Sequence, residues 1–209
     1  MKEHQAIERT ATADVVWAGG RRAKSVARFE AGASVTYVTC GGFGMADLLR
    51  EALEWTGPAE IHVATWTIAR RDILALARHV ASGCTLRLLV DTKLRQRHPR
   101  YADLLDSHIG RGAYRGASMN ARWAVAVGVE RAVSIRGSAN MGRNPKIEQL
   151  DVDCSVEHAQ ALAAVSQSIF DALPEGWPHE TAAEAKMRSI NPVEAPDARD
   201  DLTALAMWK

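Results

Sequence analysis

Several features that would assign a protein to a class at sight are missing from this chain. Its 209 residues contain no run of about 18 apolar residues, so we expect no membrane-spanning helix. Residues 1–14 are polar and lack the apolar core of a signal peptide. With 26 basic and 25 acidic residues the net charge is +1, so a case for binding nucleic acid or membrane must rest on local clusters.

Cysteine is also scarce. The three residues, Cys40, Cys84 and Cys154, are widely spaced and form no Cys-x-x-Cys pair. An odd number without ligand-like spacing argues against a disulfide framework or a zinc site. We therefore predict reduced cysteines in a cytoplasmic protein.

Strands and helices alternate in the pattern of residues 34–91. Three segments, 34–39, 60–65 and 85–90, are rich in β-branched residues and are predicted to be strands. Residues 44–55 and 69–81 between them place apolar side chains at helical spacing, and a glycine follows each helix. This alternation indicates βαβ units, and hence an α/β fold with a mixed, mostly parallel sheet flanked by helices.

The later part of the chain predicts a short helix over 101–107, paired strands at 123–127 and 132–135, and a long helix over 158–173. Its character changes after residue 173, where prolines lie among acidic and small residues.

We therefore divide the chain into an N-terminal extension, 1–32, a domain, 33–173, and a C-terminal tail, 174–209. The apolar residues 202–208 of the tail could dock on the domain or on a protein partner.

The most informative segment is 118–151. It holds Gly137-Ser138-Ala139-Asn140, with Asn144 and Glu148 downstream. Together with the βαβαβ pattern before it, this segment resembles the active-site motif of the phospholipase D superfamily. That motif reads His-x-Lys, a strand pair, Gly-Ser-x-Asn, then Asn and Glu. The resemblance covers roughly residues 33–172 and is closest to single-motif bacterial and phage-encoded nuclease-like members.

The resemblance implies a mechanism and an assembly. In the family, one histidine attacks phosphorus to form a phosphohistidine, and a partner histidine protonates the leaving oxygen. Lysines and asparagines hold the phosphate, and neither a metal nor another cofactor is needed. A chain with one motif implies a homodimer with a composite site.

This chain departs from the motif where the chemistry is done, because Asn120-Ala121-Arg122 stands at the His-x-Lys position. An amide is not basic, so Asn120 cannot serve as the nucleophile or the acid. Arg122 keeps the positive charge and adds a planar donor fork suited to phosphate. Ser138 and Asn140 keep their donors, and Glu148 is expected to pair with Arg122 or to orient a neighbour.

Another histidine could replace the missing one. His62 lies on a predicted strand, where a histidine is more often structural than catalytic. His98 and His108 flank the segment before the motif and could reach the edge of a cleft.

A basic run follows the third predicted strand, and an aromatic residue follows the second. Such a run is usually a solvated loop, but open α/β sheets place ligands at the carboxyl ends of their strands. The run could therefore contact the backbone of DNA or RNA. The aromatic residue could line a pocket or pack at the strand end. These residues are Lys93, Arg95, Arg97, Arg100 and Trp66.

Glycines at positions 41, 42 and 44 could cradle a phosphate or simply make a tight turn.

Three hypotheses about function remain. The favoured one is a phospholipase D-like protein with a degenerate active site that binds the nucleic-acid backbone without cleaving it. The alternatives are an active metal-independent phosphodiesterase or nuclease with a surrogate nucleophile, and a structural or protein-interaction module on the same fold.

Overall fold

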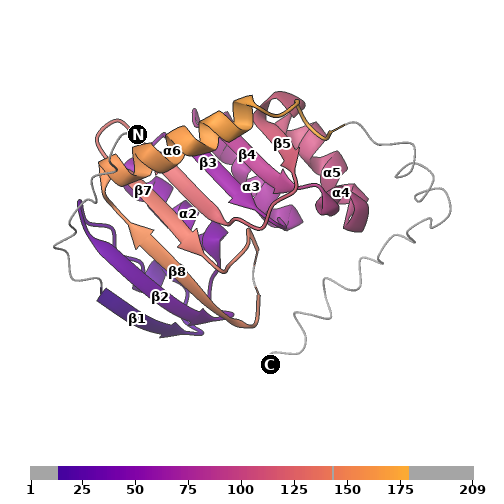
Figure 1. Cartoon of the computed structure of the whole chain (residues 1–209). Helices are drawn as coiled ribbons and strands as arrows, with labels where there is room; N and C mark the ends of the chain where they lie inside the picture. The colour runs from indigo at the N-terminus through magenta and orange to yellow at the C-terminus, as the bar shows by residue number, and fades with distance from the viewer. Residues whose placement is uncertain (1–13, 143, 179–209) are drawn as a thin grey trace, which may run out of the picture. The chain divides into compact units, whose positions relative to one another are not determined.

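The computed structural model describes residues 14–142 and 144–178, which form one sheet flanked by helices (Figure 1). The described strands are β1 (Asp14–Gly19), β2 (Ser34–Cys40), β3 (Glu60–Thr65), β4 (Thr85–Asp91), β5 (Tyr114–Ala117), β6 (Trp123–Val127), β7 (Ala132–Gly137) and β8 (Ile147–Asp153). They lie in the order β1-β2-β8-β7-β6-β3-β4-β5.

The strand directions define a mixed sheet. β1 pairs parallel to β2, β3 to β4, and β4 to β5. The pairs β2–β8, β8–β7, β7–β6 and β6–β3 are antiparallel. Following these pairings across the sheet, β6 and β8 run against the other six strands, which share one direction. The predicted α/β fold with a mixed, mostly parallel sheet is therefore confirmed.

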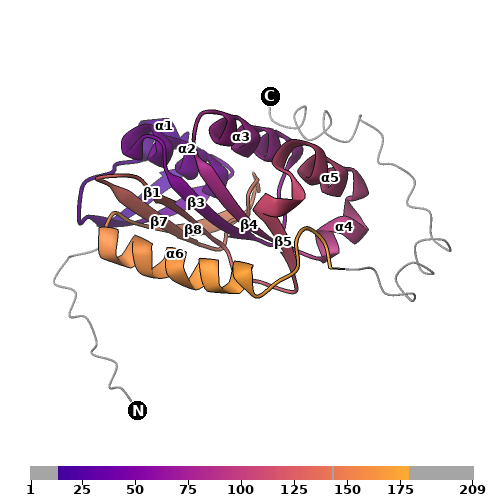
Figure 2. The ribbon, with the colours of Figure 1, turned by 90° about the horizontal axis from the view of Figure 1, so that it is seen from above.

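Helices cover both faces of the sheet. They are α1 (Ala23–Val26), α2 (Met45–Thr56), α3 (Arg70–Ala81), α4 (Lys93–Arg97), α5 (Pro99–Leu104) and α6 (Val156–Asp171), with a π-helical turn at Leu105–Ile109 and a 3-10 turn at Arg111–Ala113. Figure 2 shows α6 on one face, and α1, α2 and α3 on the other. Among the described residues, no helix is both long and apolar enough to cross a membrane.

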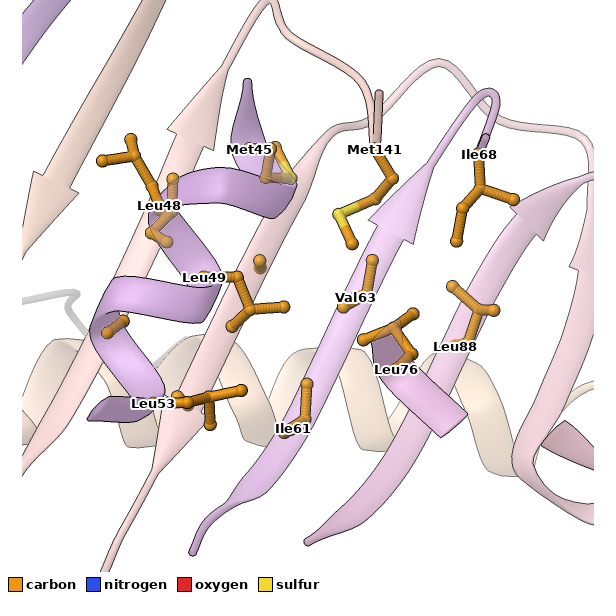
Figure 3. Close-up of a cluster of buried hydrophobic side chains, with 14 of the residues drawn as sticks. Met45, Leu48, Leu49, Leu53, Ile61, Val63, Ile68, Leu76, Leu88 and Met141 are labelled. Carbon is orange, nitrogen blue, oxygen red and sulfur yellow. The ribbon is translucent and has the colours of Figure 1, made fainter. Parts of the chain in front are cut away.

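The main core lies between the sheet and the helices α2 and α3 (Figure 3). Side chains alternate between faces along a strand, so Ile61 and Val63 of β3 point into this core. Ala64 lies on the other face, where it packs with Phe170 of α6. Fully burying a side chain such as that of Ile61 or Val63 contributes about 1.5–3 kcal/mol to folding stability. Ten of the core side chains are labelled in the figure: Met45, Leu48, Leu49, Leu53, Ile61, Val63, Ile68, Leu76, Leu88 and Met141.

Regular periodicity predicted some elements well and missed others. α2, β3, α3 and β4 agree with the predicted segments to within one residue at each end. β5 and β8 were not predicted from the sequence, and their buried faces include charged residues. Arg115 of β5 is 8% exposed and Glu148 of β8 is 7% exposed. A charge at a core position interrupts the alternation that marks a strand.

Both predicted flanking segments contain ordered structure. Residues 14–32 of the predicted N-terminal extension include β1, which forms the edge of the sheet, and α1. At the start of the predicted tail, the ring of Trp177 lies 5.4 Å from that of Tyr114, and the Gly116 N–H donates to the Gly176 carbonyl at 2.8 Å. The remainder of the tail, including 202–208, lies outside the described residues.

Candidate functional site

Most of the residues predicted for the site lie at one end of the sheet. β3 ends there at Thr65, β4 at Asp91 and β7 at Gly137, while β6 begins there at Trp123 and β8 at Ile147. We call this the site end. The opposite end of the strands, where β8 ends, is called the far end. The carboxyl ends of most strands meet at the site end, which is where open α/β sheets bind ligands.

A buried carboxylate organises the Gly-Ser-x-Asn segment. The Ser138 hydroxyl donates to one carboxylate oxygen of Glu148, and Nδ2 of Asn144 donates to the other at 2.7 Å. The Gln149 N–H in turn donates to the Ser138 hydroxyl at 3.1 Å. Both oxygens of a largely buried charge therefore have partners, as a buried carboxylate requires.

Arg122 contacts the second half of the motif directly. Its Nε donates to Oδ1 of Asn140 at 2.9 Å. Of the two roles expected for Glu148, its hydrogen bonds fit the second, the orientation of neighbours, because Glu148 accepts from Ser138 and Asn144. The NH2 group of the Asn140 amide is a further donor of the kind that a phosphate oxygen accepts.

Close backbone contacts explain the motif glycine and fix the loop that follows. A Cβ on Gly137 would lie 2.0 Å from the Gln149 carbonyl oxygen, so only glycine fits there. The Met141 N–H donates to the Thr65 hydroxyl at 3.1 Å, and the Ala69 N–H donates to the Met141 carbonyl at 2.9 Å. The loop after Asn140 is therefore held against the end of β3.

The glycines before α2 serve close packing. A Cβ on Gly44 would lie 2.5 Å from the Gly142 carbonyl oxygen. The Gly44 N–H, at the start of the helix, donates to the Asp47 carboxylate at 3.1 Å. A neighbouring carboxylate thus occupies a group that a phosphate would need, so of the two interpretations the tight turn fits better.

Asp91 connects two segments of the site end. It is 2% exposed, and one carboxylate oxygen accepts from the Lys93 N–H at 2.9 Å. The other oxygen accepts from the Met119 N–H at 3.0 Å. Lys93 begins α4, and Met119 directly precedes Asn120, which is exposed. One buried carboxylate therefore positions both the start of the basic helix and the residue that replaces the motif histidine.

The predicted basic run is helical and reaches the predicted aromatic residue. Lys93, Arg95 and Arg97 lie on α4, and Arg100 lies on α5. Cζ of Arg97 lies 4.5 Å from the ring centroid of Trp66, within the range of a cation–π contact. Trp66 is partly exposed and directly follows β3.

The three candidate histidines differ in access. His62 is 1% exposed, and its Nε2 lies 3.1 Å from the carboxylate of Glu60, the residue that begins β3 near the far end. Burial lowers the pKa of His62, although Glu60 acts in the opposite direction. The ring of His98 stacks on Tyr101 at 5.2 Å, and His108 is exposed on the π-helical turn. His62 is therefore closed to a ligand, whereas His98 and His108 are accessible.

The sequence did not reveal that Thr65 and Asp91 position other segments of the site, through their bonds from the Met141 and Met119 N–H groups. Both are polar residues at the end of a buried strand, which was the available signal. Within residues 14–142 and 144–178, no three His, Cys, Asp or Glu side chains gather as a metal site.

Comparison with solved structures identifies the fold. The structure of Nuc from Salmonella typhimurium, a phospholipase D family member, matches with a TM-score of 0.50 and 12% identity. The match covers 69% of this chain and 99% of Nuc. The chain has the phospholipase D fold. Neither a scan against protein-family models nor a search of curated proteins finds a match.

Two further structures are similar to this phospholipase D-like chain. NucT from Helicobacter pylori matches with a TM-score of 0.45 and 17% identity, over 68% of this chain and 99% of NucT. Polyphosphate kinase from Porphyromonas gingivalis matches with a TM-score of 0.48 and 17% identity, over 66% of this chain and 25% of the kinase.

Proposed function

We propose that this phospholipase D-like protein binds the phosphodiester backbone of DNA or RNA at its site end, without phosphohistidine chemistry. One observation carries the proposal. The network of Ser138, Asn144 and Glu148 and the contact between Arg122 and Asn140 are both formed, while the exposed Asn120 stands where the motif needs a histidine. The groups that would hold a phosphate are in place, and the group that would attack it is replaced.

The chemistry of these side chains supports binding over cleavage. A guanidinium and the NH2 group of an amide donate to phosphate oxygens at any physiological pH. The basic residues of α4, together with Arg100, would extend the contact along a polyanion. Attack on phosphorus needs a nucleophile with a usable lone pair, which the amide nitrogen of Asn120 does not offer.

The second candidate is an active metal-independent phosphodiesterase or nuclease with a surrogate nucleophile. The observation that favours it is the position of His98. This residue is exposed and directly follows Arg97, the last residue of α4, which contacts Trp66. In this mechanism the His98 imidazole would attack phosphorus and form a phosphohistidine, while the P–O bond to the leaving strand breaks and its oxygen takes a proton from solvent. Water would then hydrolyse the phosphohistidine and release His98.

We extend the proposal to the assembly and the location of the protein. A homodimer would bring two motif segments together in a composite site, as the single motif suggests.

A structural or protein-interaction role would use residues 202–208 of the tail as a docking segment. A cytoplasmic location accords with the spacing of the three cysteines. Light scattering coupled to size exclusion tests the dimer, because a monomeric mass contradicts the composite site.

The decisive experiment measures binding and cleavage of DNA and RNA, single- and double-stranded, in EDTA. The wild type is compared with Asn120→His/Arg122→Lys and with Ser138→Ala/Asn140→Ala. We expect the wild type to bind without cleaving, and the second double variant to bind more weakly. Cleavage that disappears in His98→Ala would establish the surrogate nucleophile instead. If the wild type neither binds nor cleaves, the nucleic-acid proposal fails and a protein partner takes its place.

A further inference from the structure

We infer that the ligand is a single-stranded nucleic acid, and that Trp66 and Arg97 together form a stacking platform for one of its bases. This inference rests on the proposed function, because it adds a base contact to the backbone contacts made by the rest of the site end.

The two side chains are already in contact through a cation–π interaction. Cζ of Arg97 lies 4.5 Å from the ring centroid of Trp66. Arg97 is exposed and Trp66 is partly exposed, so the pair is open to solvent. An indole and a guanidinium are both planar, and each stacks on a flat aromatic ligand. A nucleobase has the same flat shape and can stack on either group.

The platform lies beside the groups predicted to hold phosphate. The register between β3 and β6 pairs Ala64 with Trp123. Trp66, two residues after Ala64, and Arg122, one residue before Trp123, therefore leave neighbouring strands at the same end. The bond from the Met141 N–H to the Thr65 hydroxyl brings the end of the motif loop to the same place. A strand whose phosphate reaches Arg122 can thus place a base near Trp66.

A second pair of the same chemistry lies at the far end, where both of its members have further contacts within the protein. Cζ of Arg131 lies 5.1 Å from the ring centroid of Trp55. The same guanidinium donates to the Trp55 carbonyl at 3.0 Å, and the Trp55 ring stacks on Phe29. Arg131 thus ties the turn between β6 and β7 to α2. This pair provides a matched control for the platform.

The stacking platform favours a single strand over a duplex. Bases in a duplex stack on one another, whereas those of a single strand are free to stack on protein side chains. Stacking one base on an aromatic side chain strengthens binding by about 5- to 150-fold. The backbone contacts alone do not distinguish a strand with bases from one without them.

The test compares three probes on the full chain in EDTA by fluorescence anisotropy: a short oligothymidylate, an abasic strand of equal length and charge, and a duplex. We expect the oligothymidylate to bind about 5- to 150-fold more tightly than the abasic strand. Trp66→Ala and Arg97→Lys should abolish this difference. Arg97→Lys is the sharper variant, because it keeps the charge and removes the planar surface. Trp66→Phe should retain most of the difference, and Arg131→Lys should retain all of it.

The outcomes separate this inference from the proposal beneath it. Equal affinity for the oligothymidylate and the abasic strand would overturn the platform and leave backbone binding standing. Tighter binding of the duplex than of the oligothymidylate would overturn the preference for a single strand. Failure to bind any of the three probes would remove the proposed function itself. If Trp66→Ala does not fold, Arg97→Lys alone decides the matter.

Discussion

The two ends of the sheet use the same local device for different purposes. Asp91 ends β4 at the site end and Asp153 ends β8 at the far end, and each is 2% exposed. Each accepts a bond at 2.9 Å from the backbone N–H two residues later, from Lys93 and Ser155 respectively. The second oxygen differs. That of Asp91 accepts from Met119, on another segment, whereas that of Asp153 lies 3.7 Å from Nδ1 of His158, in the first turn of the adjoining helix.

A buried carboxylate can therefore stabilise a turn, as Asp153 does, or join two parts of a site, as Asp91 does. At the far end, the contacts of Asp153 with Ser155 and His158 stay within six residues of chain and support the start of α6. At the site end, Asp91 spans 28 residues to Met119 and so couples α4 to the segment that carries Asn120.

The largest effect should come from Asp91→Asn. The new amide keeps one acceptor but turns an NH2 group toward the other backbone N–H, which should cost about 1–3 kcal/mol of unfolding free energy. Because two segments then move, affinity for single-stranded DNA should fall roughly tenfold, or about 1.4 kcal/mol. The variant Asp153→Asn should leave this affinity unchanged. Denaturant unfolding and anisotropy titrations measure both quantities, and an equal loss of affinity in both variants would abolish the distinction between the ends.

The next prediction compares the loss of the buried Glu148 carboxylate with the loss of the more exposed Glu60 carboxylate. Glu148→Ala removes the acceptor of Ser138 and Asn144, so unfolding free energy should fall by about 1–3 kcal/mol and affinity by a few-fold. Glu60, near the far end, accepts from Arg87, but its side chain is 42% exposed. We therefore expect Glu60→Ala to cost less than about 1 kcal/mol and to leave affinity unchanged. Thermal unfolding of the two variants checks the order, which would be wrong if Glu60→Ala cost more.

Arg122→Ala should change the salt dependence of binding more than stability. The loss of one phosphate contact lowers the slope of log affinity against log salt by about one. Arg131→Ala, at the far end, should leave this slope unchanged, because Arg131 contacts Trp55. Titrations at several salt concentrations give both slopes, and identical slopes for Arg122→Ala and the wild type would exclude Arg122 from the phosphate contacts.

The smallest effect should be a pH dependence that leaves the site untouched. The pKa of His62 is lowered in the folded state, mainly by burial. Below the ordinary histidine pKa of about 6.5, the unfolded chain takes up a proton that folded His62 resists, so stability falls as the pH drops. His62→Gln should reduce this fall without removing it, because burial also lowers the pKa of His79. Unfolding free energies at neutral and mildly acidic pH test this, and an unchanged fall would assign the effect elsewhere.

The sequence predicted the helices and strands that have one apolar and one polar face. It did not predict strands in which a charged side chain faces the core. The regular apolar spacing of α2 and α3 located both helices to within a residue. β8 was missed because Glu148 occupies an inward position between Gln149 and the exposed Ile147, which hides the alternation. The motif resemblance predicts a glycine at position 137. The reason that no other residue fits, the nearby carbonyl of Gln149 on β8, could not be predicted from the sequence.

The site residues show the same division. The motif segment identified Ser138, Asn140 and Glu148 together, and the structure brings them to one end of the sheet. Which partner each side chain takes could not be predicted, because both Arg122 and Ser138 were chemically suitable for Glu148. The link from Asp91 to Met119 depends on the packing of β4 against β5, which brings the chain back to the strand end.

The position of β8 in the sheet determines when the sheet can finish folding. This strand is the last in the described chain, yet it lies between β2 and β7, and the Thr36 hydroxyl bonds to Asp151 across 115 residues of sequence. Contacts between residues so distant along the chain form late, because a long loop must first close. During synthesis, a nascent chain that has not reached residue 147 has neither Glu148 to order Ser138 nor a strand to fill the gap beside β2. The proposed binding site is therefore complete only when the sheet closes.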